Sequence, residues 1–169
     1  MDNLRRMASP AGPLEGRDPV AVTRRFTTLR SGAFAAALAA VAEAGGNAVI
    51  ADLRAGSGVE TLALQPDGTV SLYDGTGAAL LGAGATSEVR VAVADLAAAA
   101  DRALPDMLPA DSIGLPRTGA HAITVAAAGG LRRVDLDVAT ADPAGPIAAL
   151  HTAVLDVIHA VRRAAGSEV

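Results

Sequence analysis

Residues 59–75, VETLALQPDGTVSLYDG, decide the fold class of this chain. Apolar side chains alternate with small or polar ones on both sides of a central break, which is typical of strands that bury one face. The break at 65–68 has a proline where a turn fixes φ and a glycine where a turn needs a positive φ. The stretch therefore predicts a β-hairpin with strands at 60–65 and 69–73.

Working outward from this hairpin, the sequence predicts three helices and further strands. Helices are expected at 33–44, 95–104 and 146–164. Strands are expected at 48–53 and in a second hairpin within 121–140, whose turn is Gly129-Gly130. Residues 105–119 contain several prolines and glycines and are expected to form a loop.

Three segments allow two interpretations each. Residues 21–30 fit either a short strand or the beginning of the first helix, and the glycine-rich 75–87 fits a flexible loop or a distorted edge strand. Valines alternate in 88–93, which indicates a strand, although Val89, Val93, Leu96 and Ala100 also fit one helical face. Because valine is β-branched, we expect a strand at 88–93.

These elements predict one α+β domain over 21–169. Strands that alternate bury a single side, so we expect an antiparallel sheet of five or six strands with about three helices mainly on one face. Residues 1–20 contain three prolines and no hydrophobic period, and we expect them to be a disordered tail.

The composition excludes several classes of enzyme. Among the 169 residues, 41 are alanine, and Cys, Lys and Trp are absent. A chain without Cys has no disulfide, thiolate nucleophile or Cys-ligated metal, and one without Lys has no Schiff-base lysine and no phosphate-binding loop of the usual kind. An alanine-rich chain whose only strong bases are arginines is typical of a GC-rich genome, so we expect an actinobacterial source.

Charge and hydropathy argue against nucleic-acid and membrane binding. Residues 1–30 carry six Arg against three acids, whereas 31–169 carry eight Arg against fifteen acids. The acidic body repels phosphate, and the basic arm lacks stacking aromatics, so we expect no nucleic-acid partner. The longest uncharged run near the N-terminus, 31–42, is too short for a membrane span, and residues 1–19 lack an apolar signal core. We therefore expect no membrane association and a cytoplasmic location.

His151 and His121 are candidate catalytic residues. His151 lies in the apolar stripe of the 146–164 helix, where it could be a general base or a ligand beneath a pocket, or a partly buried structural histidine. His121 shares the inward face of its strand with apolar residues. His159 lies eight residues after His151, which is not the i, i+4 spacing that lets two histidines bind one metal. We expect no metal and no cofactor.

Asp135 and Asp137 are two further candidates, because they lie side by side on one strand face. Paired carboxylates can perform acid–base catalysis. Arg133 shares that face, which favours a solvated ion pair instead.

Two resemblances suggest what such a domain does. The stretches at 59–75, 96–109 and 121–138 resemble parts of small actinobacterial domains of the protealysin-inhibitor (emfourin) type, which implies a protein that plugs a metalloprotease cleft. With the helix at 33–44 and the strand at 48–53, the order helix, strands, helix, strands, helix is similar to secretion-chaperone-like folds, including those that serve type VII systems. That resemblance implies binding of another polypeptide. Neither resemblance assigns catalytic residues.

The leading hypothesis is a non-catalytic protein-interaction module, chaperone-like or adaptor-like, whose partner is another protein. A homodimer through an exposed alanine-rich helix face or an unpaired edge strand is a related expectation. The first alternative is a proteinaceous inhibitor of a metalloprotease. The second is a small enzyme that uses His151 or His121 with carboxylates.

Overall fold

The computed structural model describes residues 23–55, 58–82, 86–117, 119–137 and 145–166. The helices are α1 (Arg24–Ala44), α2 (Ser87–Ala103), the short 3₁₀ helix η1 (Leu104–Asp106) and α3 (Pro146–Gly166). The strands are β1 (Ala48–Ala55), β2 (Gly58–Leu64), β3 (Val70–Asp74), β4 (Ala79–Leu80), β5 (Leu108–Ala110), β6 (Ala120–Ala127) and β7 (Gly130–Asp137). The expected α+β class and the three α-helices are confirmed. The expected tail at 1–20 lies outside the described residues.

The strands form one antiparallel sheet in the order β4-β3-β2-β1-β6-β7-β5. The predicted hairpin is confirmed as β2 and β3, with Leu62 opposite Leu72. At its turn Gln65 N–H donates to the Thr69 carbonyl at 2.9 Å, and Gly68 has φ +86°. The expectation of five or six strands is wrong, because the sheet has seven.

Two of these strands are very short and lie at opposite edges of the sheet. β4 forms part of the glycine-rich 75–87, for which an edge strand was one of the two interpretations. β5 falls within the expected loop at 105–119 and pairs with β7, with Leu108 opposite Arg133. A run of three residues containing Pro109 has no recognisable strand period, so its pairing depends on the neighbouring β7 and not on its own sequence.

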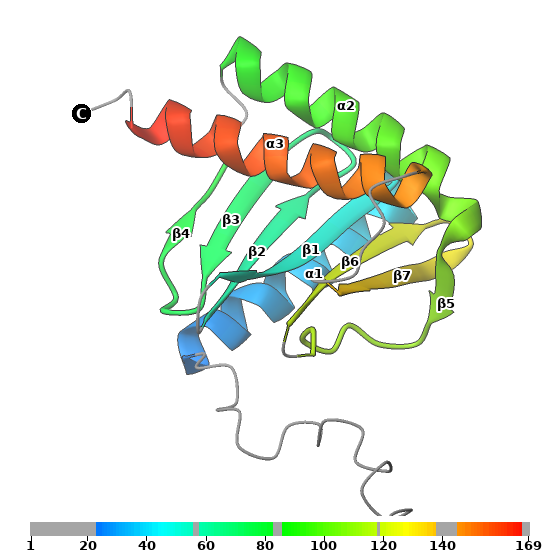
Figure 1. Cartoon of the computed structure of the whole chain (residues 1–169), viewed down its shortest axis with the longest axis horizontal. Helices are drawn as coiled ribbons and strands as arrows, with labels where there is room; N and C mark the ends of the chain where they lie inside the picture. Colours follow the sequence, from blue (N-terminus) through cyan, green and yellow to red (C-terminus); the bar gives the residue numbers. More distant parts are fainter. Residues whose placement is uncertain (1–22, 56–57, 83–85, 118, 138–144, 167–169) are drawn as a thin grey trace, which may run out of the picture.

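The helices cover both faces of the sheet (Figure 1). α2 and α3 lie side by side on one face, where Leu96 and Leu150 pack against Val49, Leu62 and Ile123. α1 lies behind the sheet, where Phe26 and Ala37 pack against Ile50 and other residues of the opposite face. Fully burying a large apolar side chain contributes about 1.5–3 kcal/mol, so both layers stabilise the fold.

The expectation that each strand buries only one side is therefore wrong for the centre of the sheet. Every residue of β2 after Gly58 is buried, and so is every residue of β6 before Ala127. Small residues such as Ala63 and Ala126 face α1 and make this double coverage compatible with a close helix-to-sheet approach. Two of the three α-helices lie on one face, but the third covers the other.

The strand expected at 88–93 is also wrong, because these residues form the first turns of α2. The hydroxyl of Thr86 accepts a hydrogen bond from the Val89 backbone N–H at 3.3 Å and so caps the helix. Val89 and Val93 then share a buried face with Leu96. Helical packing against the sheet outweighs the modest preference of valine for strands.

The first helix begins earlier than expected. α1 starts at Arg24 because Thr23 caps it, accepting a hydrogen bond from the Phe26 N–H at 3.1 Å. The ambiguous 21–30 is thus helical from residue 24.

Among the described residues, no helix is long and apolar enough to cross a bilayer.

Candidate functional sites

The structure brings together the two histidines named from the sequence. His121 lies at the start of β6 and His151 in the second turn of α3, so the pair joins the sheet to the helix layer. His121 Nδ1 and His151 Nε2 are 2.8 Å apart, and the ring centroids are 5.0 Å apart. His121 is buried and His151 half-buried.

A neutral imidazole has one donor and one acceptor nitrogen, so one ring of this pair donates to the other, and the tautomers set which ring donates. A hydrogen bond with the backbone of Arg54 raises the pKa of His121 and so opposes the effect of burial.

Burial is the main cause of the lowered pKa values of both rings. Desolvation lowers the pKa of His121 below its ordinary value of 6.5, and the charge of His151 lowers it further. Desolvation also lowers the pKa of His151. Both rings are therefore neutral at pH 7, and the pair can accommodate one proton more easily than two.

The structure places no metal-ligand cluster at the histidine pair. Among the described residues, no group of three or more His, Cys, Asp or Glu side chains could hold a metal ion. The causes of the lowered pKa of His121 do not include a carboxylate. His159 lies on the exposed side of α3.

Asp135 and Asp137 lie on β7, as expected from the sequence. Asp135 forms an ion pair with Arg133 in which Nε and Nη2 donate to its two carboxylate oxygens at 3.2 and 2.8 Å. Asp137 is exposed. Arg133 also donates from Nη1 to the Gly114 carbonyl at 2.8 Å, so this pair positions a backbone segment as well.

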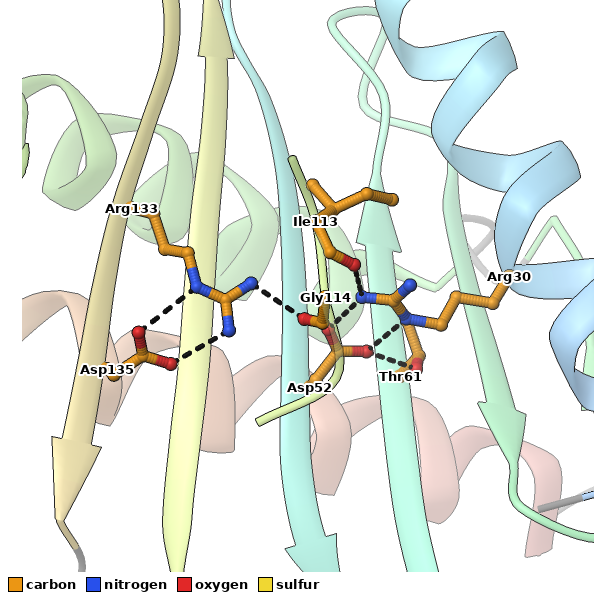
Figure 2. Close-up of polar contacts among 7 residues, drawn as sticks. All are labelled: Arg30, Asp52, Thr61, Ile113, Gly114, Arg133 and Asp135. Carbon is orange, nitrogen blue, oxygen red and sulfur yellow. Dashed lines mark hydrogen bonds and ion pairs between the residues drawn. The ribbon is translucent and has the colours of Figure 1, made fainter. Parts of the chain in front are cut away.

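A buried ion pair that sequence reasoning missed lies beside it (Figure 2). Arg30 of α1 donates from Nε and Nη2 to the two carboxylate oxygens of Asp52 on β1, the Nε distance being 2.8 Å. Thr61 on the neighbouring β2 donates its hydroxyl to the same carboxylate at 2.6 Å. Arg30 is 7% exposed and Asp52 is 1% exposed, so this network fixes α1 to the sheet inside the protein.

Two sequence signals could have indicated this network. Arg30 occupies the same helical face as Phe26 and Ala33, which are both buried. Asp52 interrupts an otherwise apolar strand at 48–53. A charge at a position that the pattern buries requires an opposite charge nearby, and these two are complementary.

The arginines of both ion pairs also hold residues 111–117, here called the strap. Figure 2 shows the strap passing between Arg30 and Arg133. Arg30 Nη2 donates to the Ile113 carbonyl at 2.8 Å, and Arg133 donates to the next carbonyl, that of Gly114. Pro116 is buried, whereas Leu115 is 37% exposed. The strap is thus attached to the sheet mainly by side chains.

The outer edge of β4 has no strand beside it among the described residues. β4 is the last strand of the sheet, and it pairs with β3 so that Ala79 lies opposite Tyr73. Asp74 N–H donates to the Ala78 carbonyl at 3.0 Å. Hydrogen-bonded pairs alternate with non-bonded pairs in an antiparallel ladder, so the N–H and C=O groups of Ala79 point away from β3. The N–H of Leu81 also points away, because it lies opposite the Leu80 carbonyl across a trans peptide bond.

Exposed leucines and two hollows accompany this edge. Leu80 is 40% exposed and Leu81 is 67% exposed. A hollow of about 290 Å³ lies between β3, β4 and α3, and its lining residues are Glu60, Leu72, Asp74, Ala78, Ala79, Leu80 and Arg162. A second hollow, of about 400 Å³, lies beyond it between Gly82, the β2–β3 turn and α2.

Comparisons of the chain with protein-family models, with curated proteins and with solved structures find no match in any of the three. The resemblances to protealysin inhibitors and to secretion-chaperone-like folds gain no support from them.

Proposed function

We propose that this chain is a protein-interaction module that binds an extended segment of another polypeptide. The segment adds to the sheet as a further strand beside β4. The observation that carries this proposal is the outward direction of the Ala79 backbone groups and of the Leu81 N–H at the end of the sheet. An unpaired strand edge is a template for a further strand, and main-chain hydrogen bonds provide much of the affinity in such complexes.

The opposite edge of the sheet is less suited to this role. Pro109 lies in the middle of β5 and has no N–H to donate. Proline at an edge strand is a common means of preventing strand addition. β4 and the residue after it contain no proline, so their outward donors are intact. The exposed leucines beside β4 supply apolar surface for a partner.

The test begins with selection of binders from a phage-displayed library of random twelve-residue peptides, with the whole chain as target. We expect the enriched peptide to protect the amides of Ala79 and Leu81 from hydrogen exchange. Leu81→Pro removes one outward N–H and changes no residue of β4, so it should weaken binding about three- to tenfold, because one backbone hydrogen bond to the peptide is lost.

A matched pair of variants distinguishes binding at the β4 edge from nonspecific hydrophobic binding. Leu81→Ser and Leu108→Ser each remove an exposed leucine, from opposite edges of the sheet, and Leu108 is 74% exposed. Only Leu81→Ser should weaken the peptide. Failure of the library to yield a binder, or binding that leaves the amides of Ala79 and Leu81 unprotected, would overturn the proposed function.

A further inference from the structure

We infer that the segment bound at β4 carries an arginine or lysine, whose side chain enters the hollow between β3, β4 and α3. This inference rests on the proposed function and adds the chemistry of the partner. It follows from the register of the edge and from the charges that line the hollow.

The strand register identifies which residue of the bound segment faces the hollow. Leu80 lies opposite Leu72, and both side chains line the hollow on the α3 face of the sheet. Residues directly opposite each other in neighbouring strands project to the same face. The partner residue opposite Leu80 therefore directs its side chain toward the hollow, and its two neighbours in sequence point to the α1 face.

Two carboxylates and one guanidinium line the hollow, so its net charge is −1. Glu60 is 9% exposed, and both of its carboxylate oxygens accept from Arg162 Nη2 at 2.7 Å. The side chain of Arg162 is 53% exposed, which leaves Glu60 covered by a single, half-exposed cation. Acidic partner side chains would be repelled here, and apolar ones would desolvate the carboxylates without compensation.

Asp74 provides the carboxylate nearest to the edge. Within the described part of the chain, its hydrogen bonds come from Thr76 N–H, Thr76 Oγ1 and Ala78 N–H, and all three use Oδ1. The hydrogen bond from the Thr76 hydroxyl lowers the pKa of Asp74, so the group is ionised at neutral pH. Its second oxygen, Oδ2, is the natural acceptor for an incoming cation.

Size and reach favour a long cationic side chain. The hollow of about 290 Å³ lies at the small end of the range for ligand pockets, about 300–1,000 Å³, and has room for one long side chain. Neighbouring strands lie roughly 4.8 Å apart, which places β3 about 10 Å from an added strand. Only arginine and lysine combine a positive charge with enough length to approach Asp74 across β4.

The experiment uses the enriched peptide and a copy in which its basic residue is replaced by glutamine, each titrated against three forms of the whole chain. Glu60→Gln makes the hollow less acidic and should weaken the basic peptide about three- to tenfold, whereas Arg162→Gln makes it more acidic and should strengthen that peptide by a similar factor. The affinity of the glutamine peptide should change less than twofold in either variant. Added salt should weaken the basic peptide more than the glutamine one in the unmutated chain, a comparison that needs no variant.

The outcomes separate this inference from the proposed function. If Glu60→Gln and Arg162→Gln both weaken the basic peptide, the pair is structural and the inference is wrong. If enriched peptides lack a basic residue, or its replacement leaves their affinity unchanged, the inference is also wrong, although protection of Ala79 and Leu81 would still support strand addition. If no peptide protects those amides, the proposed function fails, and the inference fails with it.

Discussion

His121 and His151 share a hydrogen bond across the boundary between the sheet and α3, with 2.8 Å between Nδ1 and Nε2. When both rings are neutral, one of these two nitrogens carries the hydrogen and the other accepts it. Protonation of both rings would turn two N–H groups toward each other. The contact between β6 and α3 is therefore sensitive to pH.

We expect the protein to lose stability as the pH falls below 6.5. The pKa of each histidine is lowered in the folded chain, so the unfolded chain binds more protons between pH 6.5 and the lowered values. The contribution of the histidines to the free energy of unfolding is then largest above pH 6.5. It declines as the pH falls from 6.5 toward the lowered pKa values. Urea unfolding at pH 7.5 and 5.0 measures the decline as a shift of the midpoint.

Two variants test whether His121 and His151 cause this loss of stability at low pH. His121→Phe combined with His151→Leu should flatten the pH dependence between 7.5 and 5.0. His159→Gln removes an exposed histidine of α3 and should leave the dependence as it is. An unchanged pH dependence in the double variant would show that other groups cause it.

Local chemistry explains which parts of the fold the sequence could predict. The β2–β3 hairpin was predictable because the 65–68 turn and its flanking alternation are contained in one short stretch. The alternating valines led to a wrong prediction of a strand at 88–93, because the same residues also repeat at helical spacing. The deciding feature, the Thr86 cap, lies just before them.

The candidate sites depend on contacts between residues distant in sequence. His121 and His151 could each be named, but their hydrogen bond arises only when α3 packs over β6. Arg30 and Asp52 were not predicted, because the need for a buried partner arises from α1 covering a second face of the sheet. The open edge at β4 likewise depends on strand order, which no single stretch specifies.

Breaking the buried ion pair should destabilise the protein strongly. Arg30→Met leaves the Asp52 carboxylate buried with the Thr61 hydroxyl as its one remaining donor among the described residues, and we expect a loss of about 3–5 kcal/mol in unfolding free energy. Replacing both charges, as in Arg30→Met with Asp52→Leu, should restore much of that loss because no unpaired charge remains. Arg24→Met, at an exposed position of the same helix, serves as the control and should change stability by less than about 0.5 kcal/mol. A double variant no more stable than Arg30→Met alone would contradict this account.

Loosening the strap should leave global stability nearly unchanged. Arg133→Gln removes the charged donor to the Gly114 carbonyl, while Arg30 still holds Ile113. A hydrogen bond from a charged group contributes about 1.5–3 kcal/mol, so a broad-specificity protease should cleave 112–115 at least roughly tenfold faster. The control is Arg132→Gln, since Arg132 lies opposite Val125 and belongs to the other face of β7. Equal cleavage rates in both variants would show that Arg133 does not hold the strap.

The turn that leads into β4 should depend on Gly77. Its φ is +90°, and a Cβ there would lie 2.9 Å from Arg25 Cγ and 3.0 Å from Arg25 Cβ. Gly77→Ala therefore combines backbone strain with a steric clash, and we expect it to cost about 1–3 kcal/mol, which corresponds to a fall of roughly 3–10 °C in Tm. Gly114→Ala is the matched control, because nothing lies within 4 Å of a Cβ at that position.

The same turn connects β4 to the start of α1, so the effect of Gly77→Ala should extend beyond the turn. Thr23 N–H donates to the Gly75 carbonyl and Thr23 Oγ1 to the Thr76 carbonyl, at 3.0 and 3.1 Å. A shift of residues 75–77 would disturb both the β4 edge and the residue that caps α1. Hydrogen exchange should consequently accelerate in β4 and in the first turn of α1 together, and acceleration confined to β4 would show that the two are independent.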